Sequence, residues 1–178
     1  FSPPQVLEYA IGYARDGFAI APTCADAIEL VGPFFLAEWP TSAALYLPGG
    51  KGPETGTLFH NPALAKTYER VLKEAESARG RDAQIEAARR TWYQGFVAET
   101  IDAFCRSHEF MDTSGEPHSG LLEAGDLAGF KANYEAPITY DYVAGRQTYA
   151  ICKPGPWTQG PVMLQQLALL KGFYIAAM

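Results

Sequence analysis

The stretch ITYDYVAGRQTYAIC, residues 138–152, carries the clearest β signal of the chain and decides its fold class. Ile138–Val143 and Gln147–Cys152 are rich in Thr, Tyr, Val and Ile, residue types that favour strands. Between them, Ala144-Gly145-Arg146 predicts a hairpin with a three-residue loop. An isolated two-stranded hairpin is only marginally stable in water, so we expect a larger sheet to complete it.

Helices are predicted around this hairpin, because apolar residues recur at helical spacing and turn-forming residues end each run. The expected elements are a helix over Pro4–Ala14, an extended segment at Phe18–Ala21, a helix over Pro22–Val31 that Gly32-Pro33 ends, a helix that starts after the N-cap residue Asn61 and reaches Ala75, helical structure over Ile85–Phe104 with an interruption at Gly95, a short helix over Leu121–Phe130, and a last helix from Pro161 with Met163, Leu167, Leu170 and Tyr174 on one stripe. The 178 residues suffice for one compact core and are too few for two full domains. The sequence predicts an α+β chain, mainly helical, that forms a single piece over residues 1–178.

The charge balance narrows the classes of partner. The formal net charge is -6, and Lys and Arg form no cluster, which disfavours nucleic acid and anionic membranes as main partners. The apolar run near the C-terminus is interrupted by Gln165, Gln166 and Lys171, so it falls short of the roughly 20 apolar residues of a membrane-spanning helix. We expect neither a nucleic-acid partner nor a membrane span.

The ends of the sequence predict a chain that starts inside a longer protein. The start, FSPP, lacks an initiator Met and the features of a signal peptide, and the end, GFYIAAM, is apolar.

Cys24, Cys105 and Cys152 are odd in number and far apart, so they predict neither a disulfide framework nor a metal site. The cysteines leave the compartment open.

Familiar catalytic and cofactor motifs are absent from the sequence. The run Gly49–Gly52 lacks the spacing of a phosphate-binding loop and is expected to be a surface turn. Cys105 and Cys152 have mostly apolar neighbours, which predicts buried side chains in structural roles. We therefore expect no cofactor.

The segment from Cys105 to Ser119 is polar and predicts an exposed loop. It holds four residues that are capable of binding a metal, at a spacing that fits no standard site: His108, Asp112, Glu116 and His118. A solvated loop without metal is the expected state. A metal hydrolase that uses His108 and His118 is kept as a rival hypothesis.

The turn Trp157-Thr158-Gln159-Gly160 is the one candidate substrate-binding feature. A glycine-bearing turn at a helix start presents backbone N–H groups that can hold a carboxylate. The alternative is an ordinary helix start, with Pro161 at the first helical position. Both interpretations remain open at the level of sequence.

Taken in order, these segments resemble the γ-glutamyltranspeptidase family of N-terminal-nucleophile hydrolases. The matching stretches are YARDGF at 13–18, NPALAKT at 61–67, WYQGFVAETI at 92–101, SGLLEAGDLAGFK at 119–131, EAPI at 135–138, YDYVAGRQTYAI at 140–151, PWTQG at 156–160 and LALLKGF at 167–173. Each match is short, but their collinear order over nearly the whole chain makes coincidence improbable.

The resemblance implies a precursor that cuts itself, so that a Thr becomes the first residue of a small subunit and acts as the nucleophile. The α-amino group of such a Thr can serve as its general base. The Thr attacks the γ-glutamyl amide of glutathione or a related compound, and the acyl-enzyme passes the glutamyl group to water or to an amino acid. In the family, the nucleophile follows the region that this chain resembles, and the Arg that holds the substrate's α-carboxylate precedes it.

The resemblance therefore assigns no catalytic residue to this chain. It implies a scaffold portion of the large subunit, inactive alone, whose hairpin and helices belong to a four-layer αββα sandwich. The implied partners are the rest of the large subunit, the small catalytic subunit and a small γ-glutamyl substrate, and exposed sheet edges favour self-association of the separate chain. A periplasmic or secreted location is also implied.

Two departures leave the acyl donor open. The turn at 157–160 replaces the usual Ser-Ser-Gly-Gly, and the loop through His108 and His118 looks inserted. A related acylase that prefers another amide, such as the acyl side chain of a β-lactam, fits the same pattern. A further rival is a non-catalytic helical module that binds a small ligand through aromatic residues: Tyr134, Tyr140, Tyr142, Tyr149 and Trp157.

Overall fold

The computed structural model describes residues 1–173 and divides the chain into two compact units, Phe1–Phe130 (unit 1) and the part from Lys131 onward (unit 2). The helices are α1 (Pro3–Asp16), α2 (Pro22–Glu38), α3 (Pro40–Tyr46), the 3-10 turn η1 (Pro48–Gly50), α4 (Pro62–Ala75), α5 (Arg81–Tyr93), α6 (Phe96–Ser107), α7 (Ala124–Gly129) and α8 (Gly160–Leu170). The strands are β1 (Phe18–Ala19), β2 (Leu58–Phe59), β3 (Glu109–Met111), β4 (Pro117–Ser119), β5 (Ile138–Ala144) and β6 (Gln147–Lys153). The predicted α+β class, mainly helical, is confirmed.

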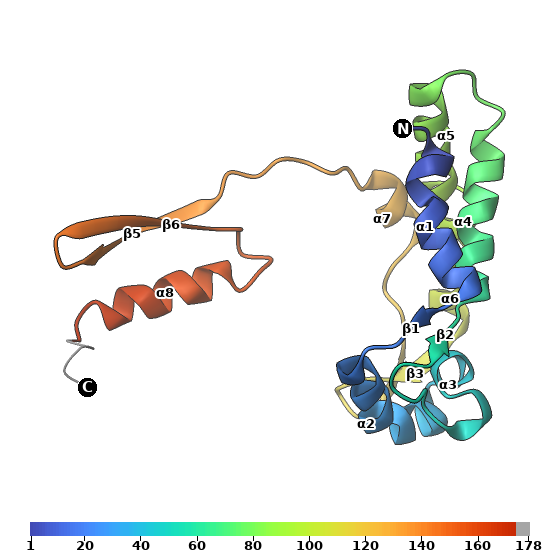
Figure 1. Cartoon of the computed structure of the whole chain (residues 1–178), viewed down its shortest axis with the longest axis horizontal. Coiled ribbons are helices and arrows are strands. Elements are labelled where there is room, and N and C mark those ends of the chain that lie inside the picture. Colours follow the sequence, from blue (N-terminus) through green and yellow to red (C-terminus); the bar gives the residue numbers. More distant parts are fainter. Residues whose placement is uncertain (174–178) are drawn as a thin grey trace. The chain divides into compact units, whose positions relative to one another are not determined.

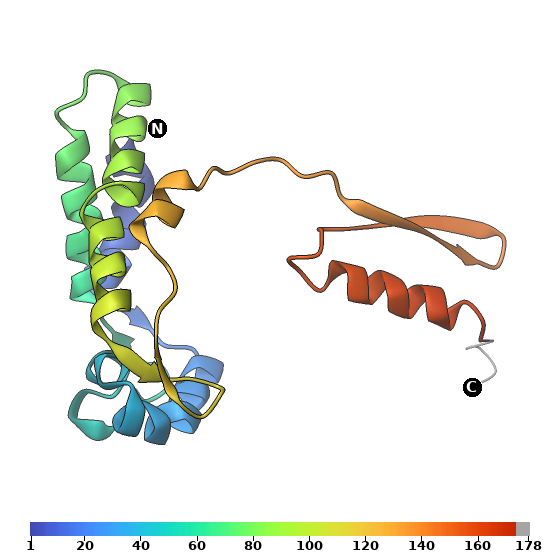
Figure 2. The same cartoon turned by 180° about the vertical axis from the view of Figure 1, so that it is seen from behind.

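Unit 1 is organised by the packing of α1 against α4, with α5 beside them (Figures 1 and 2). The centre of this packing is a small cluster of buried residues, Ile11, Ala14 and Ala65. Partly buried apolar side chains surround it: Leu7, Tyr68 and Leu72. Small residues at the centre of the contact let the two helices approach closely, and the larger side chains around them exclude water.

The end of α1 is joined to the start of α4 by backbone contacts. The N–H of Asn61 donates to the carbonyl of Ala14 at 2.8 Å, and the Asn61 side chain accepts from the N–H of Leu64 at 3.0 Å. The predicted N-cap at Asn61 is thus confirmed. Between these helices, β1 and β2 pair antiparallel, which confirms the extended segment that the sequence predicts after α1.

Gly17 makes the sharp exit from α1, because its φ is 95°, a conformation that residues with a Cβ rarely adopt. The imidazole of His60 lies against it, and a Cβ at position 17 would fall 2.6 Å from the ring. Backbone geometry and packing therefore both demand glycine here.

The predicted end of the second helix at Val31 is wrong. α2 continues through Pro33 to Glu38, although a proline inside a helix removes one hydrogen bond and crowds the preceding turn. Aromatic packing offsets this cost: the Trp39 ring lies 5.1 Å from that of Phe34 and 5.6 Å from that of Phe35. Trp39 also donates its indole N–H to the carbonyl of Met111, so a tertiary contact adds to this local packing in overriding the breaker.

The interruption predicted at Gly95 is confirmed, because α5 ends at Tyr93 and α6 begins at Phe96. A Cβ on Gly95 would lie 2.7 Å from the carbonyl oxygen of Thr91, so the chain can turn this tightly only at glycine. The guanidinium of Arg70 lies 3.7 Å from the centre of the Phe96 ring and links α4 to the start of α6.

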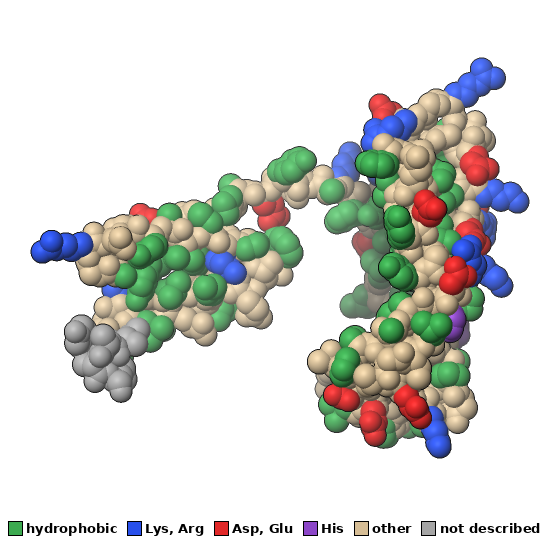
Figure 3. All heavy atoms as spheres, in the orientation of Figure 1, with side chains coloured by type: hydrophobic (Ala, Val, Ile, Leu, Met, Phe, Trp, Pro, Cys, Tyr) green, Lys and Arg blue, Asp and Glu red, His purple; other side chains and the backbone are tan. Residues whose placement is uncertain are grey.

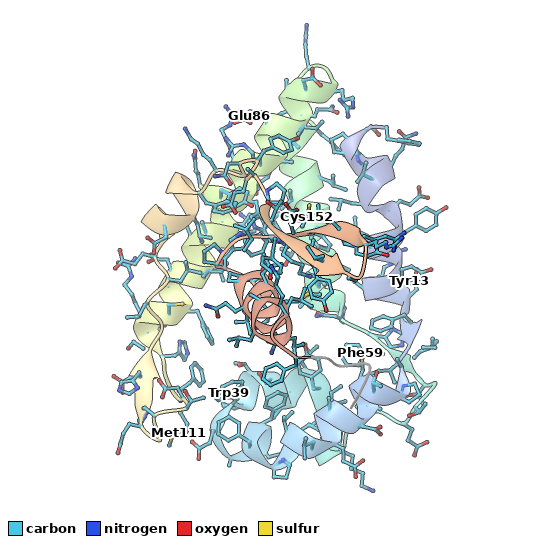
Figure 4. All side chains as sticks on the ribbon, turned by 90° about the vertical axis from the view of Figure 1, so that its left-hand side faces the viewer. Tyr13, Trp39, Phe59, Glu86, Met111 and Cys152 are labelled. Carbon is cyan, nitrogen blue, oxygen red and sulfur yellow. The ribbon has the colours of Figure 1, made fainter. Side chains whose placement is uncertain are left out.

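The prediction of an exposed loop over residues 105–119 is wrong in part. α6 extends to Ser107, and β3 and β4 then form a short antiparallel hairpin in which Phe110 faces His118. Trp39 fixes this hairpin by donating its indole N–H to the carbonyl of Met111 at 2.9 Å, and Figure 4 shows the two labelled side chains close together. The sequence shows no strand alternation here because the strands are only three residues long.

Unit 2 consists of the β5–β6 hairpin with α8 packed on it. Ala144 pairs with Gln147, so the loop has two residues and not the predicted three. Gly145 has a φ of 63°, which suits the first central position of a tight hairpin turn. Ile138, Tyr140 and Tyr142 alternate as half-buried residues along β5.

The opposite face of this hairpin is uncovered. Cys152 pairs with Thr139 on that face and is exposed, so the prediction that its side chain is buried is wrong within this chain, whereas Cys105 is half-buried.

Among the predicted stripe residues of α8, Leu167 is half-buried, Met163 and Leu170 are exposed, and Tyr174 lies outside the described residues. None of the described helices is both long and apolar enough to cross a membrane.

The exit from α1 provides a stability test. Replacing Gly17 by Ala should lower the free energy of unfolding by roughly 1–3 kcal/mol, because it forces a Cβ into a positive-φ conformation and against His60. Gly12→Ala is the matched control: it lies within α1 with open space around its Cβ position, and should be neutral or stabilising by about 0.5–1 kcal/mol. Denaturant unfolding measures both, and equal effects would contradict the proposed role of Gly17.

Candidate functional site

The candidate turn 157–160 connects β6 to α8, and hydrogen bonds within the turn hold it closed. The N–H of Thr158 donates to the carbonyl of Gly155 at 3.1 Å, and the Thr158 hydroxyl also lies 3.0 Å from that carbonyl. The same hydroxyl accepts from the N–H of Gly160 at 3.0 Å. Thr158 therefore acts as the organising side chain of the turn.

Gly160 is buried at the start of α8 and has no room for a side chain. A Cβ there would fall 2.2 Å from the carbonyl oxygen of Pro154. Gln159 occupies the N-cap position without a side-chain cap, and Pro161, which has no N–H, lies in the first turn. Because Thr158 already binds the N–H of Gly160, fewer backbone donors remain for an anion than the sequence alone allows.

Trp157 is 73% exposed, and its indole N–H donates to a carboxylate oxygen of Glu135 at 2.7 Å. This bond fastens the turn to the segment that precedes β5. The sequence predicted no role for Glu135, although the stretch EAPI at 135–138, which begins with it, is one of those that resemble the family. The four predicted residues thus lie together in one ordered turn, and their contact with a substrate stays a prediction.

The polar residues between α6 and β4 separate into different environments. His118 lies 2.9 Å from a carboxylate oxygen of Asp112. The pKa of Asp112 is lowered to about 2 by hydrogen bonds. The largest effect comes from the Ser114 side chain, followed by the Ser114 backbone N–H and then by His118. His108 instead stacks on Phe104, and within residues 1–173 no group of three or more His, Cys, Asp or Glu is arranged to hold a metal.

The glycine-rich run at 49–52 is exposed at Gly49–Lys51, and its first two glycines have positive φ, as a surface turn requires. With the face of α2 it borders a cavity of about 570 Å³. Charged side chains at this cavity belong to Asp26, Glu29, Lys51 and Glu54, all of them exposed. Exposed charges of both signs are typical of a solvated surface, so no site is assigned here.

Comparisons with known proteins agree on one family. The family model described as Gamma-glutamyltranspeptidase matches residues 3–178, nearly the whole chain. The Escherichia coli protein named glutathione hydrolase proenzyme is 29% identical over 95% of this chain and 25% of its own length. A Pseudomonas protein named acylase ACY 1 proenzyme is 28% identical over 98% of this chain and 26% of its own length.

A solved structure of LmbA2991HD is similar in both sequence and fold. It is 51% identical, superimposes with a TM-score of 0.80, and is matched over 96% of this chain and 28% of its own length. The chain therefore spans about a quarter of the length of these three relatives.

The turn before α8 can be tested through Gly160. Gly160→Ala should destabilise the protein by about 1–3 kcal/mol, because the added methyl group overlaps the Pro154 carbonyl and must displace the turn. Gly125→Ala in α7, where nothing lies within 4 Å of the added Cβ, is the control. Thermal unfolding measures both variants, and an unchanged midpoint for Gly160→Ala would show that the turn has room to relax.

Proposed function

Because this chain belongs to the γ-glutamyltranspeptidase family, we propose that it is a scaffold portion of the large subunit of an autoprocessed enzyme that transfers or hydrolyses γ-glutamyl groups. The observation that carries the proposal is the extent of the match: the family model covers residues 3–178, whereas the chain corresponds to about a quarter of its relatives. On this proposal the chain is inactive by itself, and residues 1–178 form one piece of a larger subunit.

The proposed chemistry uses a Thr that lies outside this chain. Self-cleavage frees its α-amino group, which accepts the hydroxyl proton as the oxygen attacks the γ-glutamyl carbonyl carbon. The amide bond breaks, the leaving amine takes up a proton, and a γ-glutamyl ester remains on the Thr. Water or the amino group of an acceptor then attacks the ester and regenerates the hydroxyl. The names of the relatives as proenzymes support the self-cleavage step.

The uncovered surfaces of unit 2 support the scaffold role. One face of the β5–β6 hairpin packs on α8, while the other is exposed and carries Val143, Ala150 and Cys152 beside the polar Thr139, Asp141 and Thr148. In α8, Leu169 is 72% exposed and Val162 is 46% exposed. On unit 2, Figure 3 shows hydrophobic side chains gathered along the border between the hairpin and α8, where they reach the surface. Apolar surface of this kind favours a partner layer, which the proposal identifies as the rest of the large subunit and the small subunit.

A related acylase is the second candidate. The observation that favours it is the similarity to the Pseudomonas acylase proenzyme, at nearly the identity found for the glutathione hydrolase proenzyme. The two candidates share the nucleophile and the acyl-enzyme, and differ in the acyl group accepted. The exposed Trp157 at the candidate turn is the residue of this chain on which such a difference is proposed to depend.

Turnover of γ-glutamyl anilide tests the proposed function. The protein from the full open reading frame should release aniline and yield a small subunit with an N-terminal Thr, whereas the 178-residue chain should do neither, because it lacks the nucleophile. N-terminal sequencing identifies the new terminus. Turnover of an acyl amide in place of the γ-glutamyl substrate would favour the acylase, and absence of both self-cleavage and turnover would contradict the proposal.

Whether another layer covers the open hairpin face in the whole enzyme can be tested with Cys152→Glu. Cys152 is exposed in this chain and pairs with Thr139, so on an open face the new carboxylate would be solvated and tolerated. If the face is covered in the whole enzyme, burying a charge that faces no cation should cost several kcal/mol and abolish the soluble two-subunit form. Gln147→Glu, at the exposed end of β6, is the control. Normal yield and processing of Cys152→Glu would contradict the covered face.

A further inference from the structure

A second pocket lies in unit 1, between the end of α6, the β3–β4 hairpin and Trp39 at the junction of α2 and α3. Its volume is about 250 Å³, below the usual range for drug-sized ligands and suited to a molecule with a single ring. The apolar part of its lining consists of Trp39, Phe104, Phe110 and Met111. All of these residues belong to unit 1, so the pocket does not depend on the placement of unit 2.

Aromatic rings make up one side of this pocket. The His108 ring stacks on Phe104 with centroids 4.7 Å apart, and Phe104 stacks on Phe110 at 5.3 Å. The hydrogen bond from Trp39 to the Met111 carbonyl holds the hairpin in place at the other side. Rings and a thioether fixed in this way present a flat, polarisable surface that suits another aromatic ring.

The hydrogen bonds of His108 determine which of its nitrogen atoms carries the proton. Its Nδ1 lies 3.2 Å from the carbonyl oxygen of Phe104, which can only accept. It also lies 2.8 Å from the Ser107 hydroxyl, which already donates to the carbonyl of Ala103 at 2.6 Å. Nδ1 must therefore donate, and in the neutral ring Nε2 is left as an acceptor.

The neutral His118 ring also carries its proton on Nδ1, but here a carboxylate determines the tautomer. Its Nδ1 lies 2.9 Å from Asp112, whose carboxylate is ionised at neutral pH and accepts only. Nε2 of the neutral His118 ring is again an acceptor. Both imidazoles line the pocket, whereas the carboxylate of Asp112 at the same pocket disfavours an anionic ligand. The pocket thus combines an aromatic surface with two hydrogen-bond acceptors.

We propose that this pocket binds a small neutral aromatic molecule with a hydroxyl donor, that is, a simple phenol, whose ring lies against Phe104, Phe110 and Met111 and whose O–H donates to an imidazole Nε2. The proposal uses no residue of the candidate turn before α8 and does not depend on the proposed enzymatic function. The proposal also differs from the hypothesis of a metal site at the same histidines, because here an imidazole accepts a hydrogen bond from an O–H group and binds no metal.

Methyl NMR on the whole protein tests the proposal, with phenol as the probe and the Met111 methyl signal as the reporter. Phenol should shift this signal with half-saturation on the order of 1 mM, as expected for a one-ring ligand. Toluene keeps the ring without the hydroxyl, and cyclohexanol keeps the hydroxyl without the aromatic ring. Each should bind at least fivefold more weakly than phenol.

His108→Phe keeps a stacked ring and removes the acceptor, so it should weaken phenol binding at least threefold while toluene binding stays the same or improves. His60→Ala, at the chain's remaining histidine, should leave phenol binding within twofold of the wild type, because His60 packs at Gly17 away from the pocket. Equal binding of phenol and toluene to the wild type would overturn the proposal. A Met111 signal that none of the three probes shifts would overturn it too.

Discussion

The close packing of α1 on α4 is the interaction on which unit 1 depends. Ala14 and Ala65 keep the two helices near enough for the carbonyl of Ala14 to receive the N–H of Asn61, and that bond sets both the entry into α4 and the pairing of β1 with β2. At the end of α1, the positive φ of Gly17 redirects the chain, and the His60 ring packs against this glycine. One helix contact thus positions the elements at its end, because a backbone that leaves a packed helix has few directions open to it.

Unit 2 differs from unit 1 because its own elements do not bury all of its apolar side chains. α8 covers one face of the β5–β6 hairpin, and the other face and the outer side of α8 remain exposed in the chain. The hydrophobic effect favours burial of such surface against other parts of a larger protein. This agrees with the length comparison, in which relatives are about four times as long as the chain.

The candidate turn could be located from sequence, whereas its internal bonding could not. A glycine ahead of a proline-started helix marks residues 157–160 as a helix entry. The sequence does not reveal that Thr158 binds the N–H of Gly160, or that Glu135, 22 residues before Trp157, accepts the indole proton. Contacts between residues far apart in sequence arise from the hairpin's register, which local patterns do not encode.

Local periodicity and capping residues determined most of the helices, the N-cap at Asn61, the break at Gly95 and the hairpin at 138–152, because these features depend on neighbours within a few residues. The tertiary structure decided that α2 passes through Pro33, because Phe35 packs on Tyr46 of α3 and Trp39 bonds to Met111, 72 residues later in the chain. It also decided that β3 and β4 pair, and that Cys152 lies on an open face. Each of these outcomes depends on which distant residues pack together, and that is a property of the folded chain and not of any single segment.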